Sequence, residues 1–120
     1  MFCHAFSLWL TINLADQFEI LSNYQSSYGC YDICLCPKNT DDHGIVIEFK
    51  PINTENEKNL KKTCDNALRQ IKDKGYITDL LAHNVPKNNI YVYGFAFQGK
   101  KVLISGGAEE VDWMSILDNN

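Results

Sequence analysis

The sequence predicts an α/β fold in which helices cover the faces of a mixed β-sheet. Two observations favour it. A helical pattern comes first, three strand patterns follow, and an amphipathic helix then precedes two further strand patterns. Strands that a following helix must cover form a sheet with helices on its faces. The 120 residues, of which 45% are hydrophobic and 22% charged, suffice for one ordered core, so we expect a single domain over residues 1–120.

The N-terminal half contains one helical pattern and three strand patterns. Apolar residues recur every four positions in the first segment, at Phe2, Phe6, Leu10 and Leu14, which predicts a core helix. This segment lacks the basic start of a signal peptide and is too short and polar to span a membrane. The expected elements are a helix at 2–14, strands at 18–21, 31–36 and 45–50, a polar turn at 22–29, and a hairpin loop at 38–43, with Pro37 and Pro51 closing two strands.

A long amphipathic helix is expected next. Residues 54–57, with sequence TENE, match a capping box that would begin the helix, and Gly75 would end it. Lysines flank the helix at both ends; a solvated outer face is the first interpretation, and phosphate contacts through Lys58, Lys61 and Lys62 are the alternative. The inward stripe is predicted to be Leu60, Cys64, Ala67, Leu68 and Ile71.

The C-terminal part is expected to add a short helix and two strands. The helix is predicted at residues 76–81 and the strands at 90–97 and 101–105, joined by a tight turn at Gly99. The acidic tail 106–120 carries an apolar cluster, which is compatible with a short helix that folds back or meets a second copy of the chain.

The five cysteines are odd in number and form no Cys-x-x-Cys pair. We interpret them as reduced thiols of a cytoplasmic protein. A zinc site through Cys30, Cys34 and Cys36 lacks the usual ligand spacing. The net charge of −4 does not indicate a protein held on nucleic acid by bulk positive charge.

Charged side chains end the central strand pattern, GIVIEFK at residues 44–50. Because side chains alternate along a strand, Glu48 and Lys50 point to the same face. If the preceding strand pairs with this one as a hairpin, Asp32 comes beside Glu48. Two carboxylates and a lysine at one place suit a site for a hard divalent cation. An exposed salt bridge at a strand end is the alternative interpretation.

Five stretches of the chain carry a resemblance to a known family. They are FCHAF, LSNYQSSYGCYDI, IVIEFK, ALRQIKDKGY and IYVYGFAFQGKKVLI, and they run from Phe2 to about Ile104. In this order they resemble the PD-(D/E)XK nuclease superfamily, and more closely the nuclease-like domain C-terminal to bacterial and archaeal ATPase-like proteins. The resemblance implies a restriction-endonuclease-like αβββαβ core.

The resemblance also implies roles for individual residues. Asp32 and Glu48 would bind Mg2+ or Mn2+ together with the backbone carbonyl of Phe49, and Lys50 would be the catalytic lysine. The motif Q-x(5)-Y would place two further residues over the site. They are Gln70, which would position water or a phosphate oxygen, and Tyr76, and a supporting histidine on the first helix corresponds to His4.

The implied function is metal-dependent phosphodiester hydrolysis, with DNA as the expected substrate. The chain departs from the family pattern at Cys30, where arginine is common, and at Tyr24 and Gln25, which replace arginine and glutamate. An acidic residue that often precedes the first-helix aromatic is missing. The alternative is therefore an inactive nuclease-fold module that binds protein or nucleic acid. With either function, the expected protein partner is a second copy of the chain or an ATPase-like partner domain.

Overall fold

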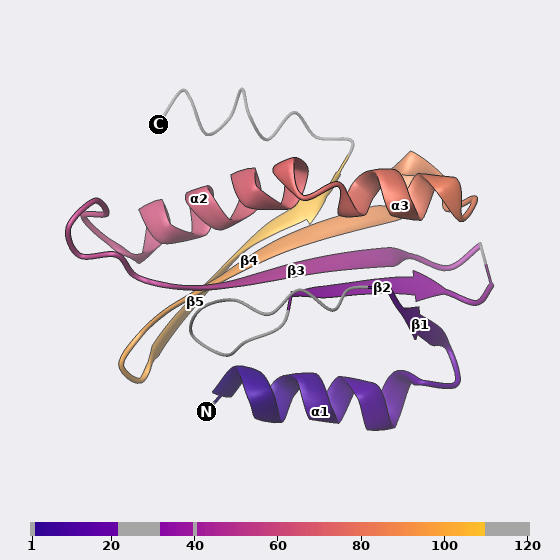
Figure 1. Cartoon of the computed structure of the whole chain (residues 1–120), viewed down its shortest axis with the longest axis horizontal. Helices are drawn as coiled ribbons and strands as arrows, with labels where there is room; N and C mark the ends of the chain where they lie inside the picture. The colour runs from indigo at the N-terminus through magenta and orange to yellow at the C-terminus, as the bar shows by residue number, and fades with distance from the viewer. Residues whose placement is uncertain (1, 22–31, 40, 110–120) are drawn as a thin grey trace.

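The helices and strands follow one another along the chain in the predicted order (Figure 1). The structure is a computed structural model that describes residues 2–21, 32–39 and 41–109. The order confirms the αβββαβ core. The elements are α1 (Phe2–Leu14), β1 (Phe18–Ile20), β2 (Ile33–Pro37), β3 (Gly44–Pro51), α2 (Leu60–Asp73), α3 (Tyr76–Ala82), the 3-10 turn η1 (Lys87–Asn89), β4 (Ile90–Gln98) and β5 (Lys101–Ala108).

The strands form one mixed sheet in the order β1-β2-β3-β4-β5. Only β3 and β4 are parallel, and the α2–α3 segment connects them across one face. Strands β2 and β3 form the predicted antiparallel hairpin, in which Ile33 pairs with Ile47 and Cys34 with Val46. Continuing this register by one residue places Asp32, directly before β2, opposite Glu48.

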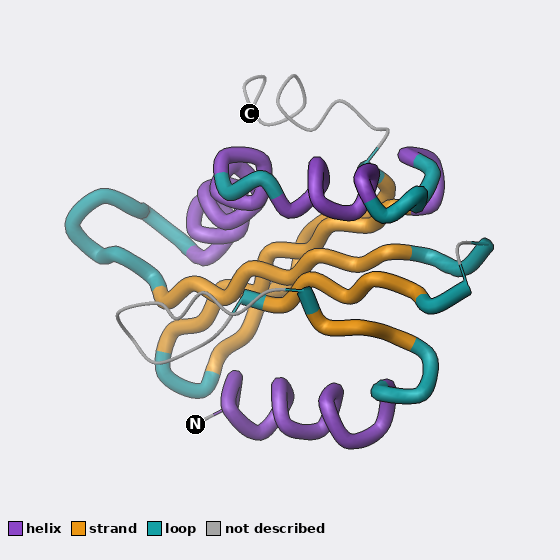
Figure 2. Tube along the Cα trace, turned by 45° about the vertical axis from the view of Figure 1, so that its right-hand side comes forward, coloured by secondary structure: helices purple, strands orange, loops and turns teal. Residues whose placement is uncertain are grey.

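Helices cover both faces of the sheet. Helix α1 lies against one face, and α2 with α3 lies against the other (Figures 1 and 2). The alternation along β3 sorts its side chains between the two layers as predicted: Ile47 and Phe49 pack in the α1 layer, whereas Val46 packs in the α2–α3 layer. Glu48 and Lys50 therefore belong to the α2–α3 face.

Helix α2 packs closely on β4 through the predicted stripe. A Cβ atom added at Gly94 would lie 2.9 Å from the carbonyl oxygen of Cys64, so the absent side chain allows this approach. Four of the five predicted stripe residues are buried, and the fifth is half-buried. The buried ones are Cys64, Ala67, Leu68 and Ile71, and the half-buried one is Leu60.

The predicted start of this helix is wrong. Helix α2 begins at Leu60, and its N-cap is Asn59, whose side chain accepts a hydrogen bond from the Lys62 N–H at 3.0 Å. The predicted capping box at Thr54 does not form because Glu57 is buried and bonds to other partners. The predicted end is correct, since Lys74 is the C-cap and Gly75 follows with a left-handed φ of 78°.

Pro37 and Pro51 close β2 and β3 as predicted and are themselves the last residues of these strands. Strand β5 differs from the prediction, because it continues beyond the expected end at residue 105. Gly106 has φ 145°, and an added Cβ would collide with the Val92 carbonyl, so glycine lets the pairing of β5 with β4 continue.

Several predictions fall where the structure gives no description. The polar turn 22–29, the start of the second strand at Tyr31 and most of the tail, from residue 110, lie outside the described residues. Cys30, Tyr24 and Gln25 do as well. Within the ranges that are described, no helix is long and apolar enough to cross a membrane.

Candidate functional site

Two carboxylates lie buried side by side in the α2–α3 layer. Asp32 and Glu48 have exposed fractions of 2% and 1%. They come together because apolar residues pair along the β2–β3 hairpin, and the same register brings Asp32, directly before β2, opposite Glu48 within β3. Burying two such groups is costly unless a cation or hydrogen-bond donors compensate them.

The compensating cation is Lys74, at the end of α2. Its Nζ lies 2.7 Å from Asp32 Oδ2 and 2.7 Å from Glu48 Oε1, so one ammonium group bridges both carboxylates. Gly75 makes this possible, since its left-handed conformation turns the chain sharply between α2 and α3. Lys74 belongs to the lysines expected on a solvated face; its side chain is 35% exposed, but its ammonium bonds to two buried carboxylates.

Tyr76 supports the same pair from the far side of Gly75. Its side chain is almost fully buried, and its hydroxyl donates a hydrogen bond to Asp32 Oδ2 at 2.9 Å. The position of Tyr76 over the carboxylates agrees with the motif that singled it out. Asp32 thus accepts hydrogen bonds from a phenol and from an ammonium group.

The surroundings of Glu48 oppose its ionisation. Burial is the main cause that raises the pKa of the Glu48 carboxyl, and neighbouring Asp32 raises it further, whereas Lys74 lowers it. Glu48 Oε2 is buried and has no hydrogen-bond partner among the described residues. For Lys74, burial lowers the pKa, but the hydrogen bonds to both carboxylates outweigh it and raise the pKa.

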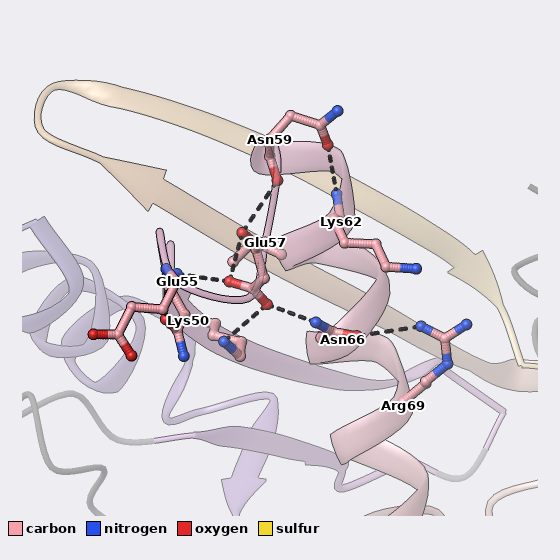
Figure 3. Close-up of polar contacts among 9 residues, drawn as sticks. Lys50, Glu55, Glu57, Asn59, Lys62, Asn66 and Arg69 are labelled. Atoms are coloured by element: carbon pink, nitrogen blue, oxygen red, sulfur yellow. Dashed lines mark hydrogen bonds and ion pairs between the residues drawn. The ribbon is translucent and has the colours of Figure 1, made fainter.

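Lys50 lies on the same face but bonds elsewhere. Its Nζ forms an ion pair with Glu57 Oε2 at 3.1 Å (Figure 3). The side chain of Lys50 is 16% exposed and that of Glu57 only 2%. The charge of the predicted catalytic lysine is therefore balanced by a carboxylate from the loop before α2.

Glu57 collects donors from the strand end, the loop and α2. Although burial opposes its ionisation, these donors lower the pKa of Glu57 to about 2. The group thus stays charged at neutral pH. Its donors are the Asn53 N–H (2.7 Å), the Thr63 hydroxyl (3.0 Å), the Asn66 side-chain amide (2.6 Å) and Lys50 Nζ.

A polar pocket of about 490 Å³ adjoins these groups. It is lined by Glu48, Lys50, Gln70 and Lys74 together with residues of the loop before α2. Gln70 lies one helical turn before Lys74, and its carbonyl accepts the Lys74 N–H. Three of the four predicted catalytic residues, Glu48, Lys50 and Gln70, thus border one hollow, and the fourth, Asp32, shares the Lys74 ammonium with Glu48.

Two predicted residues are placed only in part. The ring of Phe49 packs against Phe95 in the α1 layer at 5.4 Å, away from the carboxylates, so the predicted metal contact would have to come from the Phe49 backbone carbonyl. His4 lies in α1, but its side chain is outside the described part of the structure. Their roles stay predictions.

The lysines at the start of α2 border a second hollow. Lys58, Lys61 and Lys62 are exposed and line a pocket of about 370 Å³ with Asn56, Asn59 and Asp65. Lys61 also pairs with Asp65 at 3.4 Å. Neighbouring residues of the loop before α2 border the two pockets, Thr54 and Glu55 the one beside Glu48 and Asn56 the second.

The cysteines form no metal site in the described ranges. Cys34, Cys36 and Cys64 are buried free thiols, and burial raises the pKa of Cys34 to about 12. Neither these thiols nor any other set of three or more His, Cys, Asp and Glu residues is grouped so as to hold a metal ion in the described segments. Among the ion pairs of the described residues, Lys74 is the cation that bonds to two acidic side chains, Asp32 and Glu48.

The predicted set of site residues does not include Lys74 and Glu57. A signal for Lys74 was present, because it lies four residues after Gln70, on the same helix face, and two before Tyr76. The capping-box spacing of Thr54 and Glu57 predicts a helix cap and gives no sign that Glu57 is a buried acceptor.

Comparison with known proteins assigns the fold to a family. The sequence model of the PD-(D/E)XK nuclease superfamily matches residues 2–106, which span every described helix and nearly all of the sheet. No curated protein and no solved structure matches the chain. Since the match covers most of the chain and the fold agrees with it, the chain belongs to the PD-(D/E)XK nuclease superfamily.

Proposed function

We propose that this chain is a metal-dependent nuclease that hydrolyses phosphodiester bonds in DNA. The observation that carries the proposal is the pair of buried carboxylates, Asp32 and Glu48, whose oxygens converge on one cation, the Lys74 ammonium. Membership of the superfamily supports a nuclease-type fold, and nucleases of this superfamily generally use divalent metals.

The residues present fit a divalent cation. Hard cations prefer carboxylate oxygens, and the buried Glu48 Oε2 still lacks a partner within the described residues. Asp32, Glu48 and the backbone carbonyl of Phe49 would hold the ion. A divalent cation bound there supplies a Lewis acid that lowers the pKa of water and offsets negative charge on the phosphate.

Lys50 and Gln70 would act on the substrate from the pocket. The Lys50 ammonium has three donors, of which one is used by Glu57, and the others can reach a phosphate oxygen or a water. Because the Lys50 ammonium is paired with Glu57, we assign Lys50 to orientation and charge stabilisation rather than to proton abstraction. The Gln70 amide can hold a phosphate oxygen or the attacking water in place.

The exposed lysines of the second pocket would contact the nucleic acid backbone. Lys58, Lys61 and Lys62 lie beyond the loop that borders the first pocket, so a strand that enters the site can continue across them. Such contacts position the substrate without reading its sequence.

A plasmid-nicking assay tests the proposal. Wild-type protein with Mg2+ or Mn2+ should convert supercoiled DNA to open circles, and EDTA should stop the reaction. Asp32→Asn should lower the rate by about a hundredfold or more, because even loss of a residue that only supports a metal ligand commonly costs about ten- to a hundredfold. Single-stranded DNA and RNA, assayed alongside, identify the preferred substrate.

A matched control is Asp42→Asn, the same substitution in the exposed loop between β2 and β3. It should cut at the wild-type rate. Cleavage that is equal in Asp32→Asn and in wild type would show that the activity belongs to a contaminant or to another site.

One observation favours the alternative, an inactive nuclease-fold module that binds nucleic acid or protein. Lys50 is paired with Glu57, and Lys74 bonds to both Asp32 and Glu48. Burial and the neighbouring Asp32 raise the pKa of Glu48, and with Glu48 neutral these charges balance without a metal ion. Binding of DNA that does not change with Mn2+, together with no nicking in any metal, would support this module over the nuclease.

The proposed location is the cytoplasm, as one domain. Three buried free thiols support a reducing compartment. A homodimer and an ATPase-like partner domain remain part of this proposal, and sedimentation of the purified protein measures the first of them.

A further inference from the structure

We propose that Lys74 is a tethered competitor of the divalent cation: its ammonium occupies the cation position between Asp32 and Glu48 and must leave when an ion binds there. This inference rests on the proposed function, since it takes the two carboxylates as the metal ligands. It assigns to Lys74 control over the affinity of the site for Mg2+ or Mn2+.

The geometry makes the two cations mutually exclusive. Lys74 Nζ lies 2.7 Å from one oxygen of each carboxylate. A Mg2+ ion bridging these two oxygens would lie about 2.1 Å from each of them. Both positions fall in the same small space between Asp32 and Glu48, so ion and ammonium would overlap. Their like charges also oppose joint occupancy.

The ammonium is an incomplete substitute for the ion. It bonds to Glu48 through Oε1 alone, and Glu48 Oε2 is buried and unpartnered within the described segments. An ion that binds the Glu48 carboxylate could use this second oxygen as well. Tyr76 does not have to move when an ion binds. Its hydroxyl donates a hydrogen bond to Asp32 Oδ2, and a carboxylate oxygen can accept this bond while it binds a cation.

The pocket beside the carboxylates has room for the displaced Lys74 ammonium. Its side chain is 35% exposed, whereas the carboxylates that it bridges are buried, and it lines the 490 Å³ pocket with Lys50 and Gln70. Its backbone is held at the end of α2 by the hydrogen bond to Gln70. Rotation of the flexible four-carbon stem can therefore move the ammonium into the pocket without disturbing the helix.

The consequence is a reduced apparent affinity for metal. A ligand that needs a minor conformation binds more weakly by the fraction of molecules in that conformation. Here the competent conformation has Lys74 turned away from Asp32 and Glu48. Removing the ammonium should thus strengthen metal binding.

Isothermal titration calorimetry with Mn2+ tests this inference. Lys74→Met should bind Mn2+ about tenfold or more tightly than wild type. The control is Lys72→Met, which removes the same charge from an exposed position of the last turn of α2 and should leave the affinity within about twofold. Asp32→Asn should abolish Mn2+ binding both in the otherwise wild-type protein and in the Lys74→Met variant.

A second readout follows the displaced group directly. In 15N-labelled wild-type protein, the Lys74 ammonium should give a protected side-chain signal that is missing from the spectrum of Lys74→Met. Addition of Mg2+ should shift or broaden that signal to the behaviour of a free lysine. A Lys74 signal that stays unchanged while Mg2+ saturates the site would overturn the inference, as would equal Mn2+ affinities of wild type and Lys74→Met.

The outcomes separate this inference from the proposed function. If wild type and Lys74→Met bind Mn2+ equally and the binding depends on Asp32, Lys74 is not a competitor, but the metal site of the proposed function stands. If no variant binds Mn2+, both the competitor role of Lys74 and the proposed metal site are contradicted. If Lys74→Met does not fold, as circular dichroism would show, Lys74→Gln replaces it, because its amide can still donate a hydrogen bond to one carboxylate.

Discussion

The Glu57 carboxylate ties the loop before α2 to the strand end and to the helix. It accepts hydrogen bonds from Lys50 on β3, from the Asn53 N–H in the loop and from Thr63 and Asn66 on α2. Figure 3 shows this convergence, with Asn66 linked in turn to Arg69. Glu57 thereby positions Lys50, although it does not line the pocket itself.

Glu57→Gln should lower the free energy of unfolding by about 2–4 kcal/mol at pH 7. The substitution removes the charge that compensates Lys50 and turns one acceptor oxygen into a donor facing other donors. Urea denaturation measures the change. Glu55→Gln is the control, because Glu55 is exposed, and it should stay within about 0.5 kcal/mol of wild type. Equal effects of both substitutions would contradict the role of Glu57.

The stabilisation by Glu57 should depend on pH. Its pKa falls from an ordinary value of 4.5 to about 2 in the folded protein, so the folded state favours the ionised form. The contribution is complete above about pH 4.5 and is lost as the pH falls toward 2. The difference in unfolding free energy between wild type and Glu57→Gln should therefore narrow over this range. A difference that stays constant down to pH 2.5 would contradict it.

At the scale of elements, burial decides where α2 begins. Thr54 and Glu57 have the spacing of a capping box, but Glu57 bonds inward, and the helix begins after Asn59. A local signal is overridden here because a buried carboxylate must find donors, and α2 and the strand end offer them.

Asn59→Ala should destabilise the protein by about 1 kcal/mol, because it removes the side-chain acceptor for the Lys62 N–H. Thr54→Ala should have an effect within about 0.5 kcal/mol, since Thr54 is exposed. Thermal or urea unfolding of the two variants gives the comparison. The reverse order of effects would restore the capping box.

Gly75 sets the turn that presents Lys74 and Tyr76 to the carboxylates. Gly75 has a left-handed φ of 78°, and an added Cβ would meet nothing within 4 Å. Gly75→Ala should therefore lower the free energy of unfolding by about 1–2 kcal/mol through backbone strain alone. Gly75→Asn should cost less, since asparagine tolerates this conformation. Unfolding free energies of the two variants check this; an equal loss in both would point to another cause.

For the whole molecule, the sequence suffices to predict a mixed sheet with helices on its faces and the order of the elements along the chain, but not the order of the strands within the sheet. Alternation along residues 45–50 separates the faces of β3, and the spacing of Cys64, Leu68 and Ile71 predicts the buried side of α2. The β2–β3 hairpin follows from the polar loop between them, and with it the meeting of Asp32 and Glu48. These signals are local, or they repeat with the period of one element.

Contacts between distant segments were harder to predict. Lys74 reaches Asp32 across 42 positions of the chain, and its place in a lysine-rich helix end looks like a solvated face. Lys50 has the sequence context of a catalytic lysine, but its partner, Glu57, depends on the path of the loop before α2. Such pairs form where folding buries oppositely charged side chains from distant segments together. The periodicity of the sequence carries no information about which segments these are.

The most direct test is a crystal structure of the protein grown with Mn2+, with anomalous scattering used to locate the metal. The account predicts one Mn2+ ion about 2.2 Å from a carboxylate oxygen of Asp32 and from one of Glu48, with the Lys74 ammonium moved into the pocket. No anomalous peak between the two carboxylates at saturating Mn2+, with Lys74 still bridging them, would contradict it.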